Sequence, residues 1–221
     1  MAMGIVSGLL SLIGCKKESE TNQAMKTTGS VVLQSVPFET QLGTFRQLGL
    51  VTNSGVELSD IDRWGGSEAY EQEPYSLLYS TLGQTIEREP WTPISDKCWT
   101  FDTEAIEDHG SYVSIMQNLE RLAHGEIRFE EPDDHVNLDV NTAWVSFTIN
   151  GDSYKWDMVV NDDWVDPQIF TKVVELTKKY RTRGKYTYYN TAGQDVVIGY
   201  ETPESLNKIV AATGLNIVWL H

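Results

Sequence analysis

An asparagine–glycine pair at residues 150 and 151 is the feature that most limits how this chain folds. This dipeptide is the strongest short-range signal for a tight β-hairpin turn. Apolar and polar residues alternate on both sides of it, over residues 143–149 and 153–160. Because successive side chains of a strand point to opposite faces, the alternation predicts an antiparallel pair that is buried on one face. The expected inward positions are Val145, Phe147 and Ile149, and then Tyr154, Trp156, Met158 and Val160.

Other segments follow the 3.6-residue period of a helix. This spacing predicts helices over residues 108–123 and from residue 169 to the region of Tyr180. Thr202-Pro203 predicts the start of a last helix, because Thr caps and Pro suits the first turn, and Gly214 predicts its end. Residues 75–82 form an ordered apolar piece that the pattern does not assign to a type. Further strands are expected over residues 30–36, 45–51, 126–130, 136–140, 186–190, 195–200 and 215–220.

Hairpins mixed with helices, without a regular alternation of strand and helix, predict an α+β fold. We expect a mostly antiparallel sheet with hairpins and two or three packed helices. The chain of 221 residues has room for one large domain or two small ones. Residues 16–29, KKESETNQAMKTTG, have the composition of a linker. We therefore expect an apolar segment plus a polar linker over residues 1–29 and a single α+β domain over residues 30–221.

The first fourteen residues are uncharged, largely apolar and too short to span a bilayer as a helix. Two interpretations fit them. Leu12–Cys15 resembles a bacterial lipobox, in which Cys15 is acylated after cleavage, so the protein would be a membrane-anchored lipoprotein. However, no Lys or Arg precedes the apolar run, whereas a secretory signal normally has one. We favour a cytoplasmic protein and keep the lipoprotein as the alternative.

A formal net charge of −15 limits the possible partners. Such a field repels nucleic acid and anionic lipid, so we expect no nucleic-acid binding, and membrane binding only if Cys15 is acylated. The charge favours a basic protein partner, although solubility alone also explains it. Sixteen acidic and three basic residues lie within 101–170, whereas residues 171–190 contain six basic residues and one acidic. This asymmetry predicts an interaction surface, unless the basic block neutralises the acidic face within the molecule.

The stretch WDMVVNDDWVDPQIF, residues 156–170, concentrates four aspartates. They lack the alternate spacing and the central glycine of a calcium loop. Asp166-Pro167 instead predicts a helix start, with Asp166 accepting a free backbone N–H. Local structure does not explain the residue types at Asp162, Asp163 and Trp164 in the same way. Trp164 either anchors a partner or folds back over the core.

Motifs for a cofactor, a metal or a catalytic group were not found. His109, His124 and His135 lack metal-ligand spacing, and neither a glycine-rich phosphate loop nor a nucleophile elbow occurs. We expect no cofactor, no metal, no catalytic residue and no enzyme activity. A hydrolase with carboxylates from separate strands is the less favoured alternative, since such residues converge only in the fold.

The acidic residues expected in exposed turns are the candidate contacts for a partner. They and the adjacent tryptophan form the predicted binding set: Glu130, Glu131, Asp133, Asp134, Asp162, Asp163 and Trp164.

A resemblance to a protein family extends over roughly residues 100–221. It is based on two longer stretches, INGDSYKWDMVVNDDWVDPQIF and YNTAGQDVVIGYETPESL. Together with the acidity, they make the chain resemble bacterial immunity proteins of polymorphic toxin systems. The resemblance implies a non-enzymatic protein that binds one cognate toxin and blocks its active site. Nuclease toxins have cationic substrate clefts, so an acidic inhibitor would imitate phosphates and associate quickly.

Overall fold

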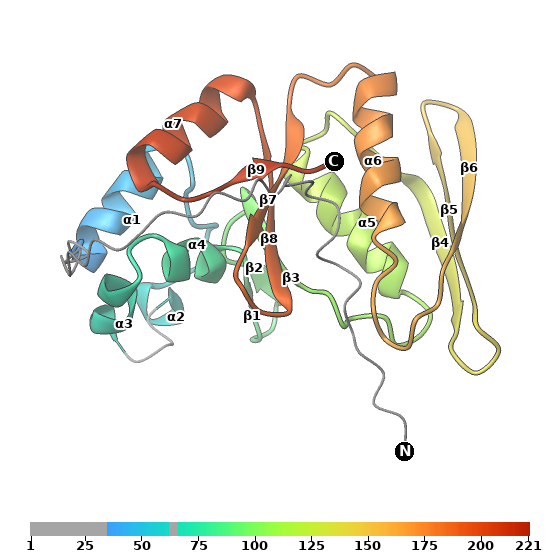
Figure 1. Ribbon diagram of the computed structural model, residues 1–221, viewed down its shortest axis with the longest axis horizontal. Helices are drawn as coiled ribbons and strands as arrows, with labels where there is room; N and C mark the ends of the chain where they lie inside the picture. Colours follow the sequence, from blue (N-terminus) through green and yellow to red (C-terminus); the bar gives the residue numbers. More distant parts are fainter. Residues whose placement is uncertain (1–34, 62–65) are drawn as a thin grey trace, which may run out of the picture. The chain divides into compact units, whose positions relative to one another are not determined.

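The structure, a computed structural model, describes residues 35–61 and 66–221 (Figure 1). Helices and antiparallel sheets share this part of the chain, which confirms the α+β prediction. Ser35–His221 form one compact unit. The helices are α1 (Phe38–Gln47), α2 (Leu58–Ile61), α3 (Ser67–Gln72), α4 (Ser76–Leu82), α5 (Ser111–Leu122), α6 (Gln168–Lys179) and α7 (Pro203–Thr213). The strands are β1 (Thr85–Ile86), β2 (Thr92–Pro93), β3 (Cys98–Asp102), β4 (Glu130–Asn137), β5 (Thr142–Ile149), β6 (Asp152–Met158), β7 (Lys185–Asn190), β8 (Asp195–Glu201) and β9 (Val218–Trp219).

The predicted hairpin at residues 150 and 151 is confirmed as β5 and β6. Asn150 and Gly151 have φ angles of 49° and 82°, the pair of positive values that a type I′ turn needs. Val145 lies opposite Trp156, as the alternation predicts. β4 pairs with the other edge of β5, so the three strands form an antiparallel sheet in the order β4-β5-β6.

A second antiparallel sheet has the order β3-β8-β7-β9. Its central hairpin, β7 and β8, confirms the strands predicted over residues 186–190 and 195–200. The last predicted strand is shorter than expected, because only Val218 and Trp219 pair with β7. β3 comes from the stretch that the sequence pattern left undefined, and it pairs with β8 along its whole length.

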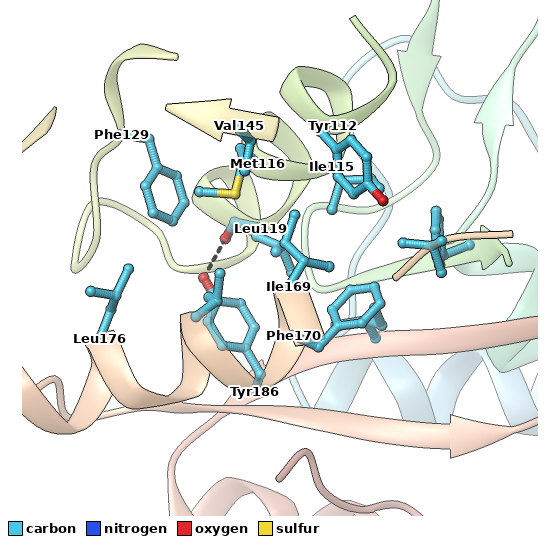
Figure 2. Close-up of a cluster of buried hydrophobic side chains, with 14 of the residues drawn as sticks. Tyr112, Ile115, Met116, Leu119, Phe129, Val145, Ile169, Phe170, Leu176 and Tyr186 are labelled. Carbon is cyan, nitrogen blue, oxygen red and sulfur yellow. Dashed lines mark hydrogen bonds between the residues drawn. The ribbon is translucent and has the colours of Figure 1, made fainter. Parts of the chain in front are cut away.

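The four-stranded sheet separates two hydrophobic cores. Tyr186, Ile198 and Tyr200 belong to the larger core, in which α5 and α6 pack between this sheet and β4-β5-β6 (Figure 1). Val197 belongs to the smaller core on the opposite face, with residues of α1, α4 and α7. Figure 2 shows the larger core, where the Tyr186 hydroxyl donates to the Leu119 carbonyl oxygen over 2.8 Å. β8 is therefore buried on both faces, and its successive side chains belong to opposite cores.

The helix predictions are confirmed with small shifts. The buried residues of α5 are Tyr112, Ile115, Met116, Leu119 and Leu122, and those of α6 include Ile169, Phe170, Val173, Val174 and Leu176. At α7, the Thr202 side chain accepts the N–H of Ser205, and Gly214 ends the helix in the left-handed conformation. Residues 76–82 of the unassigned apolar piece are helix α4.

Two predicted strands of the N-terminal part are not found as expected. The prediction over residues 45–51 is wrong, because α1 continues to Gln47 and no strand follows. The buried residues Phe38, Gln41 and Phe45 recur at helical spacing. The polar side chain of Gln41 can be buried because its amide donates to the Tyr70 carbonyl oxygen over 2.9 Å. Of the strand predicted over residues 30–36, residues 30–34 lie outside the described part, and Ser35 and Val36 belong to no strand.

The strands predicted over residues 126–130 and 136–140 are wrong in their bounds. One strand, β4, covers the residues between them instead. Before β4, the N–H of Phe129 donates to the Glu120 carboxylate over 2.7 Å rather than to a neighbouring strand. After β4, the N–H of Asn141 closes a turn on the Leu138 carbonyl oxygen, which leads directly into β5.

Candidate functional site

The acidic residues at 130–134 lie on strand β4 and not in the predicted turn. The sheet register shifts between Glu130 and Asp133, and Glu131 has a positive φ of 51°. The strand therefore contains a β-bulge at the place where the sequence pattern predicted a turn. Glu130, Glu131 and Asp133 are exposed, but Asp134 is buried.

Asp134 has a structural role at the start of α5. Its carboxylate accepts the N–H of Gly110 over 2.7 Å and the N–H of Val113 over 3.0 Å. These are unsatisfied donors at a helix N-terminus, where negative charge is also favourable. Nδ1 of His109 lies 3.5 Å from the same carboxylate. With its side chain only 2% exposed, Asp134 cannot contact a partner, so its place in the predicted binding set is wrong.

The turn between β6 and α6 contains the other predicted contacts. Asp162 is exposed, whereas Asp163 and Trp164 are half-buried. Trp164 is not among the partly buried apolar side chains that pack against either core of the described residues, so the structure does not place it as a lid. The Asp163 carbonyl oxygen accepts the N–H of Ile106 over 2.9 Å. This bond fixes the turn beside the loop that follows β3.

Asp166 connects the two elements on either side of this turn. Its buried carboxylate accepts the N–H of Gln168, the first residue of α6, over 2.9 Å. The same carboxylate accepts the N–H of Val159 over 2.8 Å, which ties the end of β6 to the start of α6. The predicted use of Asp166 for a helix-start N–H is therefore found, with the helix beginning one residue after Pro167.

The two groups of predicted contacts do not lie together. Glu130 pairs with Thr148 near the β5–β6 turn, whereas the Asp162 turn follows Met158, which pairs with Ala143 at the other end of β5. Thr148 and Ala143 are five positions apart along β5, a distance of about 17 Å.

Asp162 and Asp163 instead join carboxylates that the sequence analysis did not select. The N–H of Val165 donates to the Thr103 carbonyl oxygen, and the Thr103 hydroxyl donates to the Gln194 carbonyl oxygen over 2.8 Å. Three segments distant in sequence thus meet at one place. We call their carboxylates the acidic face: Asp102, Glu104, Glu107, Asp108, Asp162, Asp163 and Asp195.

Like charges dominate the electrostatics of the acidic face. Partial burial and the charge of Asp102, its partner across β3 and β8, raise the pKa of Asp195. Within the described residues, none of the acidic face carboxylates forms an ion pair with Lys or Arg. The excess of acidic residues between 101 and 170 was the sequence signal for this face, but it could not indicate which of them converge.

The basic block does not neutralise the acidic face. Five of its six residues lie at the C-terminal end of α6 and beyond, whereas the Asp162 turn precedes the N-terminal end, about 18 Å away for a helix of 12 residues. The sixth, Lys172, lies in the first half of α6, with Nζ 5.7 Å from the Trp156 ring centroid. Residues at the C-terminal end have nearer acidic partners. Lys179 Nζ lies 2.7 Å from the Asp152 carboxylate, and Arg183 lies 3.2 Å from that of Glu126.

A groove adjoins the acidic face between β3, α5 and the β1–β2 hairpin. It has a volume of about 650 Å³. Trp91, Trp99 and Phe101 give it an aromatic lining, and Asp102 and Asp108 add carboxylates from the acidic face. Trp91 is 63% exposed, the most for any tryptophan of the described part. The centroids of the Trp99 and Phe101 rings lie 4.6 Å apart.

The three histidines considered in the sequence lie at the two ends of α5 and on β4. His124 follows the end of α5, where partial burial and the charge of Lys97 lower its pKa. His109 and His135 contact each other, with ring centroids 5.1 Å apart. Over residues 35–61 and 66–221, no group of three or more His, Cys, Asp or Glu side chains has the arrangement of a metal site. No helix in the same ranges is long and apolar enough to cross a membrane.

The chain was compared with protein-family models, with curated proteins and with solved structures, and none of them matches it.

Proposed function

We propose that this chain is a non-enzymatic binding domain that captures a basic protein partner through the acidic face. The observation that carries the proposal is the convergence of carboxylates from three segments, without an ion pair to Lys or Arg in the described residues. Clustered like charge disfavours the folded state, so a surface that keeps it unpaired is typical of association with an opposite charge.

An immunity protein that neutralises a cognate toxin is the biological form we propose for this domain. The acidity and the character of residues 100–221 support it, as does the location of the acidic face on neighbouring strand ends and loops. An inhibitor of a cationic active site needs fast capture, and complementary charge accelerates diffusional encounter. We expect such a protein to act in the cytoplasm. The lipoprotein alternative depends on Cys15, which lies outside the described residues; acylation at Cys15, detected by mass spectrometry of native protein, would support it.

The experiment begins with a partner that is identified by cross-linking in the source cells. Its association rate is then measured by stopped-flow for the wild type and for the double variant Asp162→Lys, Asp163→Lys. We expect the double variant to associate about tenfold more slowly at low salt and almost normally at high salt, because salt screens exposed charges.

A matched control makes the same charge change elsewhere. Glu130→Lys, Glu131→Lys alters the net charge equally, but at the opposite end of the three-stranded sheet. We expect this control to slow association much less than the change at Asp162 and Asp163. Equal slowing by both double variants would show that the net charge, and not the acidic face, governs the encounter.

Among the described residues, the groove beside the acidic face is a place where the hydrolase alternative could act. Asp102 and Asp108 line the same groove, which also holds two tryptophans. Turnover of an oligosaccharide that is lost in both Asp102→Asn and Asp108→Asn would support that alternative.

A further inference from the structure

We propose that the groove between β3, α5 and the β1–β2 hairpin binds an extended segment of the partner and receives an arginine or lysine side chain from it. This inference rests on the proposed function, since it identifies where and how a basic protein would be anchored. In addition to long-range attraction, the cationic side chain would make short-range contacts with Trp91 and Trp99, beside the carboxylates of Asp102 and Asp108.

Three of the other described tryptophans, but not Trp164, lie under lysine side chains. Lys155 Nζ lies 3.9 Å from the Trp144 ring centroid. Lysines also lie over the rings of Trp156 and Trp219, both with Nζ 5.7 Å from the ring centroid. In the described part of the chain, no Lys or Arg lies over Trp91 or Trp99. Trp91, which is 63% exposed, therefore presents a ring face that a cation from another molecule can use, whereas the Trp99 ring also contacts Phe101.

The groove has a negatively charged lining. Its lining contains Asp102 and Asp108 but neither Lys nor Arg. One oxygen of the Asp102 carboxylate accepts the N–H of Glu104 over 2.9 Å, which holds the side chain in place and leaves the other oxygen available. An aromatic face beside a carboxylate suits guanidinium, which stacks on rings and donates to carboxylates in one plane.

The shape of the groove suits an extended peptide. The groove is open, and Ser114 adds a polar side chain to the wall formed by α5. A hydroxyl group at this place can bind the backbone of an extended peptide. Trp91 is 63% exposed on the β1–β2 hairpin, where an aromatic side chain gains the most from being covered. The adjoining acidic face then contacts further basic residues of the same segment.

The test uses three fluorescein-labelled heptapeptides in which glycine alternates with arginine, with lysine or with citrulline. Citrulline keeps the shape of arginine without the charge. Fluorescence anisotropy titrations with the full chain are expected to show binding of the arginine and lysine peptides and at least a tenfold loss for citrulline. A citrulline peptide that binds equally well, or a neutral oligosaccharide that competes for the groove, would overturn the inference.

Variants then separate the groove from the acidic face. Trp91→Ala is expected to weaken binding of the arginine peptide by about fivefold or more at both low and high salt, because the ring contact is not screened. Asp102→Asn with Asp108→Asn is expected to weaken it as well. Asp162→Lys with Asp163→Lys is expected to weaken it only at low salt. Circular dichroism of each variant confirms that it is folded, and Trp91 is exposed enough for its removal to leave the core intact.

The outcomes distinguish this inference from the function on which it rests. If the groove variants bind the arginine peptide normally while the Asp162 and Asp163 variant does not, the groove inference fails and the acidic face remains the binding surface. If neither the arginine peptide nor the cross-linked basic partner binds the wild type, both proposals fail.

Discussion

Replacing Asp134 by alanine is the sharpest test of how the acidic residues divide between structure and binding. Its carboxylate accepts the N–H groups of Gly110 and Val113, and its side chain is 2% exposed. Gly110 is the N-cap of α5 and has no side chain with which to accept a helical N–H. Asp134→Ala therefore leaves two partly buried donors at a helix start without this acceptor.

The magnitude follows from these two bonds. A hydrogen bond to a charged group contributes about 1.5–3 kcal/mol, and a charge at a helix N-terminus adds up to about 1 kcal/mol. Because such contributions overlap, we expect the free energy of unfolding to fall by about 3–4 kcal/mol. For a domain of this size, that corresponds to a decrease of roughly 10 °C in Tm. Asp134→Asn keeps one acceptor oxygen and should lose about half as much.

The assay is urea unfolding followed by circular dichroism, with the neighbouring Asp133→Ala as the matched control. Asp133 is exposed on the same strand, so its replacement should leave the free energy of unfolding within about 0.5 kcal/mol of the wild type. A loss below about 1 kcal/mol for Asp134→Ala, or an equal loss for both variants, would refute the assignment of Asp134 as the cap of α5.

Three further predictions concern other buried or paired groups. Partial burial opposes ionisation of Glu126, but the backbone N–H groups of Gly184 and of the residue before it outweigh that effect and hold the pKa of Glu126 below its ordinary value. The stabilising contribution of the Glu126 carboxylate is therefore present above about pH 4.3 and is lost as the pH falls through the lower folded pKa. Urea unfolding at several pH values should accordingly show that the stability difference between the wild type and Glu126→Gln shrinks on acidification. Burial raises the pKa of the Cys98 thiol to about 12, so in a protein whose other cysteine is serine, Ellman's reagent should label it only after unfolding, and rapid native labelling would contradict its burial. In Gly184→Ala, the added Cβ would overlap the Tyr200 ring, so thermal melting should show a loss of about 1–3 kcal/mol, whereas Gly193→Ala, with nothing nearer than 3.7 Å, should be close to neutral.

The elements predicted well from the sequence are those whose signals are local. The Asn150-Gly151 turn, the Thr202-Pro203 helix start and the stripe of α6 each depend on a few neighbouring residues, whose backbone preferences and periodicity are written in the chain. The predictions failed where distant contacts decide the conformation. Residues 45–51 have enough apolar character for a strand, but the buried amide of Gln41 bonds to a segment some thirty residues away and packs α1 as a helix.

The sequence by itself determined the α+β class, the net charge and the segment in which acidic residues concentrate. The tertiary structure alone decided which carboxylates are available to a partner. Asp133 and Asp134 are adjacent and chemically identical, yet one faces solvent and the other caps α5, because successive residues of a strand point to opposite faces. Asp102, Asp162 and Asp195 are distant in the chain, yet the pairing of β3 with β8 and hydrogen bonds between loops bring their segments together. Convergence of this kind depends on pairing between remote segments, which local patterns do not encode.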